Sequence, residues 1–178
     1  MNARKLTTLA MLTAISIVLV YLIRIPMFLP FLEYDPADIP IFLATLSFGP
    51  ATGLILTVVV SLLQGLTVSA GSGWIGIAMH ILATGSFVLV AGLLHRRFAG
   101  WKGACAAMGC GVATMTCVML LWNYLLTPIF MNMPRAEVVP YLLPAFLPFN
   151  LIKAGGNALV ALVLYRYLGG FLKGRITA

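Results

Sequence analysis

Residues 6–23 read LTTLAMLTAISIVLVYLI, an apolar run without a charged side chain that directly follows Arg4 and Lys5. A helix needs roughly 20 apolar residues to cross the hydrocarbon core of a bilayer. Signal peptides share a basic start and an apolar run, but no small-x-small cleavage site followed by a soluble domain comes after this one. We therefore interpret residues 6–23 as a first transmembrane span that is retained.

The composition of the whole chain extends this interpretation. Of 178 residues, 62% are hydrophobic and only 8% are charged, and the mean hydropathy is +1.07. Soluble domains are about half apolar and about a quarter charged. After allowance for loops, a chain of this length supplies about six spans and almost no extramembrane domain. We predict a single-domain (1–178), all-α integral membrane protein with six transmembrane helices, which is not an enzyme.

Proline, glycine and charge divide the remaining apolar sequence into segments. The predicted second helix looks too short to span upright, so we expect its ends to be re-entrant or the bilayer to be locally thin. We interpret residues 27–38 and 127–144 as loops between spans. The further helices are expected at about 39–48, 50–68, 74–97, 103–126 and 146–168.

The distribution of charge predicts the orientation. If the N-terminus lies inside, every acidic residue falls in an outer segment, with only Arg24 and Arg135 as outer cations. This asymmetry is the one that the positive-inside rule describes, so both termini are predicted to be cytoplasmic. The net charge of +7 is then explained by basic residues beside the membrane spans, and it does not indicate nucleic-acid binding. The inner segments carry Arg4, Lys5, Arg96, Arg97, Lys102, Arg166, Lys173 and Arg175.

Lys153 is the residue that most needs an explanation, because it lies inside the last apolar run. A lysine at such depth costs at least about 2.5 kcal/mol unless it meets a partner, water or a ligand. Asn150 and Asn157 stand at i−3 and i+4, so the three side chains share one helix face. A polar stripe of this kind should face a cavity. Snorkelling of Lys153 to the outer surface is the alternative.

Two further polar residues lie in apolar runs. Asn123 stands at a depth comparable with Asn150, and an amide offers a donor and an acceptor to a ligand that presents carbonyl and imide N–H groups side by side. The alternative is an interhelical hydrogen bond worth about 1 kcal/mol. For His80 we favour a hydrogen-bonded structural histidine.

The sequence offers a means of binding but no source of energy. It contains no Gly-x-x-x-x-Gly-Lys-Ser/Thr loop, no metal-ligand cluster and, in this interpretation, no intramembrane carboxylate. We also find no internal repeat, which disfavours an inverted-repeat transporter that works alone. Cys105, Cys110 and Cys117 are interpreted as small packing residues. Ala10 and Ala14 form a small-xxx-small pair against which another helix could pack closely.

Three segments resemble the S components of energy-coupling factor (ECF) vitamin transporters, in particular the riboflavin-specific type. Ala10-Met11-Leu12-Thr13-Ala14 looks like the Ala-x-x-x-Ala signature by which those subunits dock on a shared transmembrane subunit. The others are Leu32-Glu33-Tyr34-Asp35-Pro36-Ala37-Asp38-Ile39-Pro40 with Phe48-Gly49-Pro50, and Pro148-Phe149-Asn150-Leu151-Ile152-Lys153 with Asn157 and Leu164-Tyr165.

This resemblance implies a high-affinity riboflavin-binding subunit of an ATP-driven importer in the bacterial cytoplasmic membrane. Riboflavin would be the transported ligand and there would be no cofactor; the partners would be the ECF transmembrane coupling subunit and two cytosolic ATPase subunits. The open alternatives are another vitamin or flavin, or a membrane scaffold that transports nothing. By resemblance, the pyrimidine edge of the isoalloxazine ring is held by Asn123, Asn150 and Lys153, and Tyr34 helps cover it. The expected substrate-binding residues are Tyr34, Asn123, Asn150, Lys153 and Asn157, and the expected partner-binding residues are Ala10 and Ala14.

Overall fold

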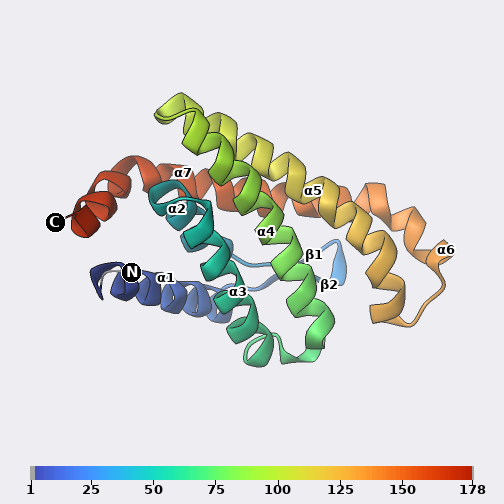
Figure 1. The fold of residues 1–178 in the computed structure, drawn as a ribbon. Coiled ribbons are helices and arrows are strands. Elements are labelled where there is room, and N and C mark those ends of the chain that lie inside the picture. Colours follow the sequence, from blue (N-terminus) through green and yellow to red (C-terminus); the bar gives the residue numbers. More distant parts are fainter. Residues whose placement is uncertain (1–2, 178) are drawn as a thin grey trace.

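The computed structural model describes residues 3–177, and the side chains of residues 173–177, with Lys173 and Arg175 among them, lie outside the described part. Helices dominate this part of the chain (Figure 1). The long elements are α1 (Ala3–Leu22), α2 (Asp38–Phe48), α3 (Pro50–Leu66), α4 (Gly73–Arg97), α5 (Trp101–Met131) and α7 (Leu147–Thr177). The short ones are β1 (Ile25–Met27), β2 (Leu29–Tyr34), the 3₁₀ turns η1 (Ala70–Ser72) and η2 (Val139–Tyr141), α6 (Arg135–Val138) and the π-helical turn η3 (Leu142–Phe146).

Four helical segments are long and apolar enough to cross a membrane: α1, η1 with α4, α5, and the segment from α6 into α7. Together with the shorter apolar helices α2 and α3, they confirm the all-helical membrane protein that the composition predicts. Large apolar side chains on α1, α3, α5 and α7 are exposed, as expected where lipid is the solvent. Both ends of the chain lie at the same end of the molecule (Figure 1). Which side of the membrane that end faces stays a prediction.

Helix α2 lies at the centre of the molecule, which explains how so short a helix is tolerated. Its residues from Asp38 to Ser47 are all buried, and it packs against α1, α3, α4 and α7. Its Phe42 ring stacks on Phe87 of α4 with 3.7 Å between the centroids. A helix that is apolar all round is expected in such a core. Because protein and not lipid surrounds α2, its length does not have to match the bilayer.

The turn between α2 and α3 depends on a glycine and packs closely against α4. Gly49 has φ of 91°, a conformation that side-chain-bearing residues rarely adopt. A Cβ on Gly92 of α4 would lie 2.9 Å from Pro50 Cα, so the turn and α4 touch through backbone. A side chain at position 92 would therefore force the turn and α4 apart.

The segment predicted as a loop at 27–38 is instead mostly a β-hairpin. The strands β1 and β2 pair antiparallel with a register shift after Pro26, and Phe28 at the turn has φ of 61°. Proline is tolerated there because a two-stranded hairpin has only edge strands. Such a hairpin is marginal alone, and here Leu32 packs in a buried cluster with Val138, Phe146 and Phe149.

Two predicted helix boundaries differ from those in the structure. Helix α5 continues past the predicted end at about 126 to Met131 with Pro128 inside it, and it ends where Asn132 adopts a left-handed conformation. Helix α7 follows a π-helical turn that contains Pro144 and continues well beyond the predicted end at about 168. Proline marks irregular turns here, but it does not end α5.

Candidate functional site

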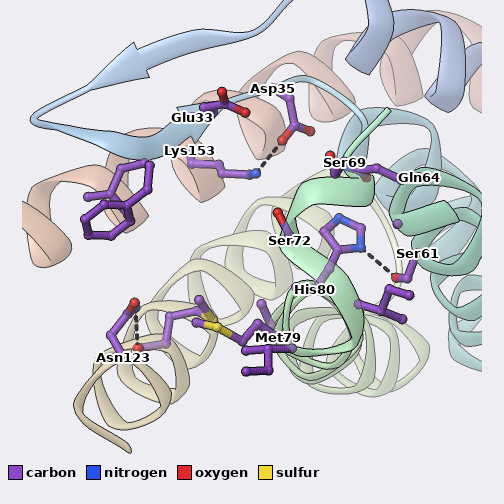
Figure 2. A pocket seen from close by; sticks show the side chains of 18 of the residues that line it. Glu33, Asp35, Ser61, Gln64, Ser69, Ser72, Met79, His80, Asn123 and Lys153 are labelled. Carbon is purple, nitrogen blue, oxygen red and sulfur yellow. Dashed lines mark hydrogen bonds and ion pairs between the residues drawn. The ribbon is translucent and has the colours of Figure 1, made fainter. Parts of the chain in front are cut away.

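A cavity of about 200 Å³ lies between the hairpin, α3, η1, α4, α5 and α7 (Figure 2). It combines a polar wall on α5 and α7 with a second polar wall on α3, η1 and α4, and apolar side chains line the space between them. The predicted site residues that line it are Asn123, Asn150 and Lys153; its other charged or histidine side chains are Arg24, Glu33, Asp35 and His80.

Lys153 is paired inside the protein with the carboxylate of Asp35. Its Nζ donates to Asp35 Oδ2 at 2.6 Å, and the two side chains are 13% and 7% exposed. Asp35 Oδ1 accepts from the backbone N–H of Ala37 at 3.1 Å, a local bond typical of aspartate in turns. The lysine therefore does not snorkel, and the partner that its depth requires comes from the segment between β2 and α2.

Asn157 joins the same segment to α7 one turn further along. It is fully buried; its Oδ1 accepts from the hydroxyl of Tyr34, and its Nδ2 donates to the carbonyl of Asp35, both at 3.0 Å. Gly156 lies next to Tyr34, and a Cβ there would make an ordinary contact at 3.7 Å from Tyr34 Oη. Burial raises the pKa of Tyr34, which keeps the phenol protonated as a donor. Tyr34 and Asn157 lie beside the cavity, outside the set of residues that line it.

Asn123 and Asn150 present amides to the cavity from α5 and α7. Each Nδ2 donates to the carbonyl four residues earlier, Met119 or Phe146, at 2.7 Å. Thr127 donates to Asn123 Oδ1 at 3.0 Å. These local bonds fix the amides, so a ligand would meet donors and acceptors that are already oriented.

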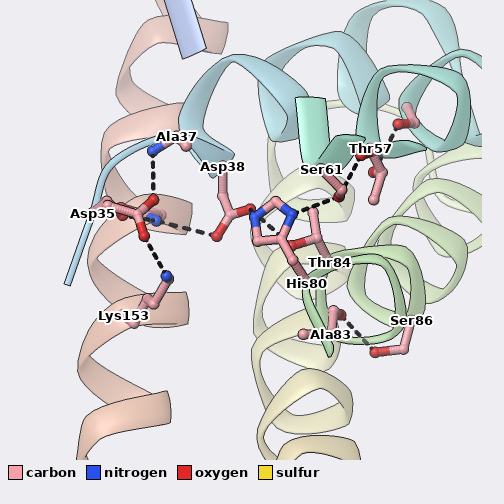
Figure 3. A network of polar contacts seen from close by, with 12 residues as sticks. Asp35, Ala37, Asp38, Thr57, Ser61, His80, Ala83, Thr84, Ser86 and Lys153 are labelled. Atoms are coloured by element: carbon pink, nitrogen blue, oxygen red, sulfur yellow. Dashed lines mark hydrogen bonds and ion pairs between the residues drawn. The ribbon is translucent and has the colours of Figure 1, made fainter. Parts of the chain in front are cut away.

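A buried polar network lies behind the cavity, and it corrects the sequence interpretation (Figure 3). The sequence predicts an outer loop for Asp38, whereas in the structure it begins α2 and is fully buried. Its Oδ1 accepts from Thr84 at 2.8 Å and lies 3.3 Å from Nε2 of His80. Asp38 is therefore a buried helical residue and not a loop residue, because α2 starts one residue earlier than predicted and lies at the centre of the fold. A carboxylate in a first helical turn is also favoured by the helix dipole.

His80 is hydrogen-bonded, as predicted, and it also lines the cavity. Its Nδ1 lies 2.6 Å from Oγ of Ser61, which itself lies 2.6 Å from the carbonyl of Thr57. Ser61 has one hydrogen to share between these contacts. If it donates to His80 Nδ1, the neutral ring carries its own hydrogen on Nε2, toward Asp38; if it donates to the Thr57 carbonyl, Nδ1 donates to Ser61 and Nε2 carries a hydrogen only in the protonated imidazolium. The spacing of residues within one apolar run could not reveal this partnership, since it spans α2, α3 and α4.

Arg24 ties the hairpin to the far side of the cavity. Its guanidinium pairs with Glu33 on β2 and donates to the carbonyl of Val68, just after α3, at 3.0 Å. The hairpin is thus held at Arg24 by the α3 end and at Tyr34 by α7. It forms a cover whose two edges are each fixed by hydrogen bonds.

The predicted partner-binding residues lie elsewhere. Ala10 and Ala14 are exposed on α1, and they line an apolar hollow of about 620 Å³ between α1 and α3. Among the described residues, none lines both this hollow and the cavity. A variant at one surface can therefore be tested without touching the other. Within residues 3–177 no group of three or more His, Cys, Asp or Glu side chains could hold a metal ion.

Known proteins resemble this chain over most of its length. Residues 4–165 match the family model described as ECF transporter, substrate-specific component. The riboflavin transporter RibU of Staphylococcus aureus (strain TCH60) is 34% identical, over 96% of this chain and 93% of its own length. The riboflavin transporter FmnP of Bacillus subtilis (strain 168) is 28% identical, over 86% of this chain and 85% of its own. A solved structure of the S component of a bacterial ECF transporter superposes with a TM-score of 0.79 at 34% identity, covering 94% of this chain and 96% of that one.

Proposed function

This chain belongs to the family of ECF transporter substrate-specific components, and we propose that within that family it binds riboflavin for import. As a member it is a multi-pass protein of the bacterial cell membrane and not an enzyme. The relatives that cover most of its length are named riboflavin transporters. The proposal extends that substrate to this chain and places it in the cavity beneath the hairpin.

The observation that carries the proposal is the wall formed by Asn123, Asn150 and Lys153. Riboflavin has an imide edge, with an N–H between two carbonyl groups. An ammonium has three donors, and Asp35 takes one of those of Lys153, which leaves donors for a ring carbonyl. The two amides supply an acceptor for the imide N–H and a donor for the second carbonyl. The set of groups on this wall thus complements the edge of the ring.

The middle of the cavity suits a flat, polarizable ring. Met79, Met115, Met119 and Phe149 all line it. Methionine is flexible and makes favourable sulfur–aromatic contacts, and aromatic rings stack at an offset or meet edge to face. An apolar middle with polar groups at defined points is the usual build of a small-molecule site.

The proposal includes the partners that supply energy. No phosphate-binding loop of the Gly-Lys-Ser/Thr kind occurs in the sequence, so ATP hydrolysis of that type has to come from other subunits. We assign this to a transmembrane coupling subunit and two cytosolic ATPases. The exposed Ala10 and Ala14 allow a partner helix to approach the backbone of α1 closely. Riboflavin would bind from the outer side, and its delivery to the inner side would follow docking.

An absorption spectrum of the purified protein tests the proposal directly. We expect a flavin band and riboflavin in the extract, or, after dialysis, quenching of riboflavin fluorescence on titration. Release of a different flavin or aromatic vitamin would keep the family and change the substrate. Failure to bind any flavin or vitamin would favour a scaffold role.

A further inference from the structure

The turn between α4 and α5 brings basic side chains together. Helix α4 ends with Arg96 and Arg97, and Lys102 is the second residue of α5. The turn is tight, because a Cβ on Gly103 would clash with the carbonyl oxygen of Phe98. The three cations therefore lie at one end of the molecule, which is the end of α5 away from α6 (Figure 1).

Helix α7 adds a fourth cation, Arg166, to this end. The ring of His95, near the end of α4, meets Tyr165 of α7 with 3.0 Å between Nε2 and Oη. The guanidinium of Arg166 lies over the ring of Trp101, 5.3 Å from its centroid, within the range of a cation–π contact. These contacts hold parts of three helices together. We call the four exposed cations there the basic cluster: Arg96, Arg97, Lys102 and Arg166.

The basic cluster has no acidic counterpart. The acidic residues of the chain lie in the hairpin and the segment after it, at the start of α2, and in α6: Glu33, Asp35, Asp38 and Glu137. Among the side chains that the structure describes, no ion pair includes a member of the cluster. Like charges on one surface repel one another, and a bound anion relieves this repulsion. The cluster therefore attracts an anion.

Exposed aromatic side chains at the cluster indicate the kind of anion. Phe98, Trp101 and Tyr167 are 58%, 42% and 76% exposed, and each adjoins a cluster member in the sequence. Tryptophan and tyrosine are enriched where membrane spans meet the headgroup layer. A phospholipid uses both kinds of side chain, because its phosphate pairs with cations and its acyl chains contact the rings. A soluble anion would use the cations alone, and an acidic protein would have to displace the headgroups at this level.

We propose that the basic cluster binds the headgroup of an anionic phospholipid such as phosphatidylglycerol. Arginine suits this role, because its planar guanidinium donates two parallel hydrogen bonds to phosphate oxygens. Basic surfaces between helices on the cytoplasmic side bind anionic headgroups, and the predicted topology puts the cluster on that side. A phosphate shared by Arg97 and Arg166 connects α4 to α7, so the lipid stabilises the packing of these helices. No member of the cluster lines the cavity or the α1–α3 hollow, so this site is separate from the proposed riboflavin site.

Thermal unfolding of the purified protein in detergent, with lipid added, tests the proposal. A ligand that binds only the folded protein raises the midpoint of unfolding. We expect phosphatidylglycerol to raise the wild-type midpoint by a few degrees and phosphatidylcholine to leave it unchanged. Sodium chloride at about 0.5 M should abolish the rise, because salt screens the charges. sn-Glycerol 3-phosphate, which carries the phosphate without acyl chains, should give no rise at the same concentration.

The variants locate the effect on the cluster. The triple variant Arg96→Gln, Arg97→Gln and Arg166→Gln should lose the response to phosphatidylglycerol, and its own unfolding transition shows that it is folded. Arg166→Gln alone should reduce the response, and it replaces the triple variant if that protein does not fold. The matched control is Arg135→Gln, because Arg135 is also exposed and lies over a ring, 4.9 Å from the centroid of Tyr124. This control should respond to the lipid as the wild type does.

Three outcomes would overturn the proposal. One is a full response to phosphatidylglycerol in the cluster variants; if these variants also give no riboflavin uptake in cells, the cluster binds a protein partner. Another is a loss in Arg135→Gln as large as in the triple variant, which would mean that the lipid senses net charge and not the cluster. The third is a rise with sn-glycerol 3-phosphate equal to that with phosphatidylglycerol, which would make this a site for soluble phosphate compounds.

Discussion

The ammonium of Lys153 lies 2.6 Å from the carboxylate of Asp35, across a separation of 118 residues in the chain. One end of this contact is the middle of α7, on the wall of the cavity. The other end is the segment between the hairpin and α2, where Asp35 also accepts from the backbone of Ala37. A ligand that contacts Lys153 therefore acts on a residue that also holds the cover of the cavity in place.

Asp35→Asn should destabilise the protein, because it leaves the buried Lys153 ammonium without its counter-charge. Breaking a buried ion pair by removing one partner costs about 3–5 kcal/mol. Thermal unfolding in detergent measures the change. The double variant Asp35→Asn with Lys153→Met should recover most of the loss, since neither charge remains. A single variant as stable as the wild type would show that the pair contributes nothing to the fold.

Lys153→Met should weaken riboflavin binding roughly ten- to a hundredfold, by loss of about 1–3 kcal/mol of hydrogen bonding in a site that water reaches poorly. Fluorescence titration measures it. From the sequence, removal of an intramembrane charge predicts a protein that inserts more easily. The structure reverses the expectation for stability, because Asp35 is left unpaired. Wild-type affinity in this variant would remove Lys153 from the site.

The position of Lys153 shows how far the sequence could predict the site. A charge in an apolar run, with Asn150 and Asn157 at helical spacing, predicts that these three side chains lie inside the protein. In the structure all three do, and Asn150 and Lys153 line the cavity. The spacing could not distinguish Asn150 from Asn157, which is covered by the hairpin. The sequence could not identify Asp35 as the partner of Lys153, because that contact depends on how α2 and α7 pack.

The fold shows the same limit. Apolar runs predicted the helices, since hydrophobic length is set by the bilayer. The hairpin was missed because its two prolines disfavour strands in general, and because the contacts that stabilise it, such as packing on Phe146 and Phe149, are to residues distant in the sequence. Gln64 and Ser61 were missed because the sequence does not show which polar side chains of an apolar helix face a cavity.

Tyr34→Phe should weaken riboflavin binding only a few-fold and lower thermal stability slightly. The phenol donates to Asn157 at 3.0 Å and lies beside the cavity, so its loss removes about 1 kcal/mol of hydrogen bonding from the cover. Titration and thermal unfolding of one preparation give both values. A loss as large as that of Lys153→Met would instead place the hydroxyl on the ligand.

A reporter fused after Ala178 should be active only if it works in the cytoplasm, by the positive-inside rule. A tag inserted at Arg135 or Ala136, both exposed in α6, should be reached by an impermeant reagent from outside intact cells. Val138 is buried and is avoided as an insertion point. An extracellular C-terminus would invert the topology and place the cavity on the inner side.

Replacing Ala10 and Ala14 together by leucine should leave riboflavin binding unchanged and abolish uptake into cells. Both side chains are exposed on α1, beside an apolar hollow that shares no described residue with the cavity. Larger side chains there keep a partner helix away from the α1 backbone. Titration of the purified variant and uptake of labelled riboflavin measure the two effects. Met11→Leu, an exposed neighbour on the same helix, is the control and should retain both. Parallel loss of binding and uptake in the alanine variant would mean that the pair stabilises this chain and not a complex.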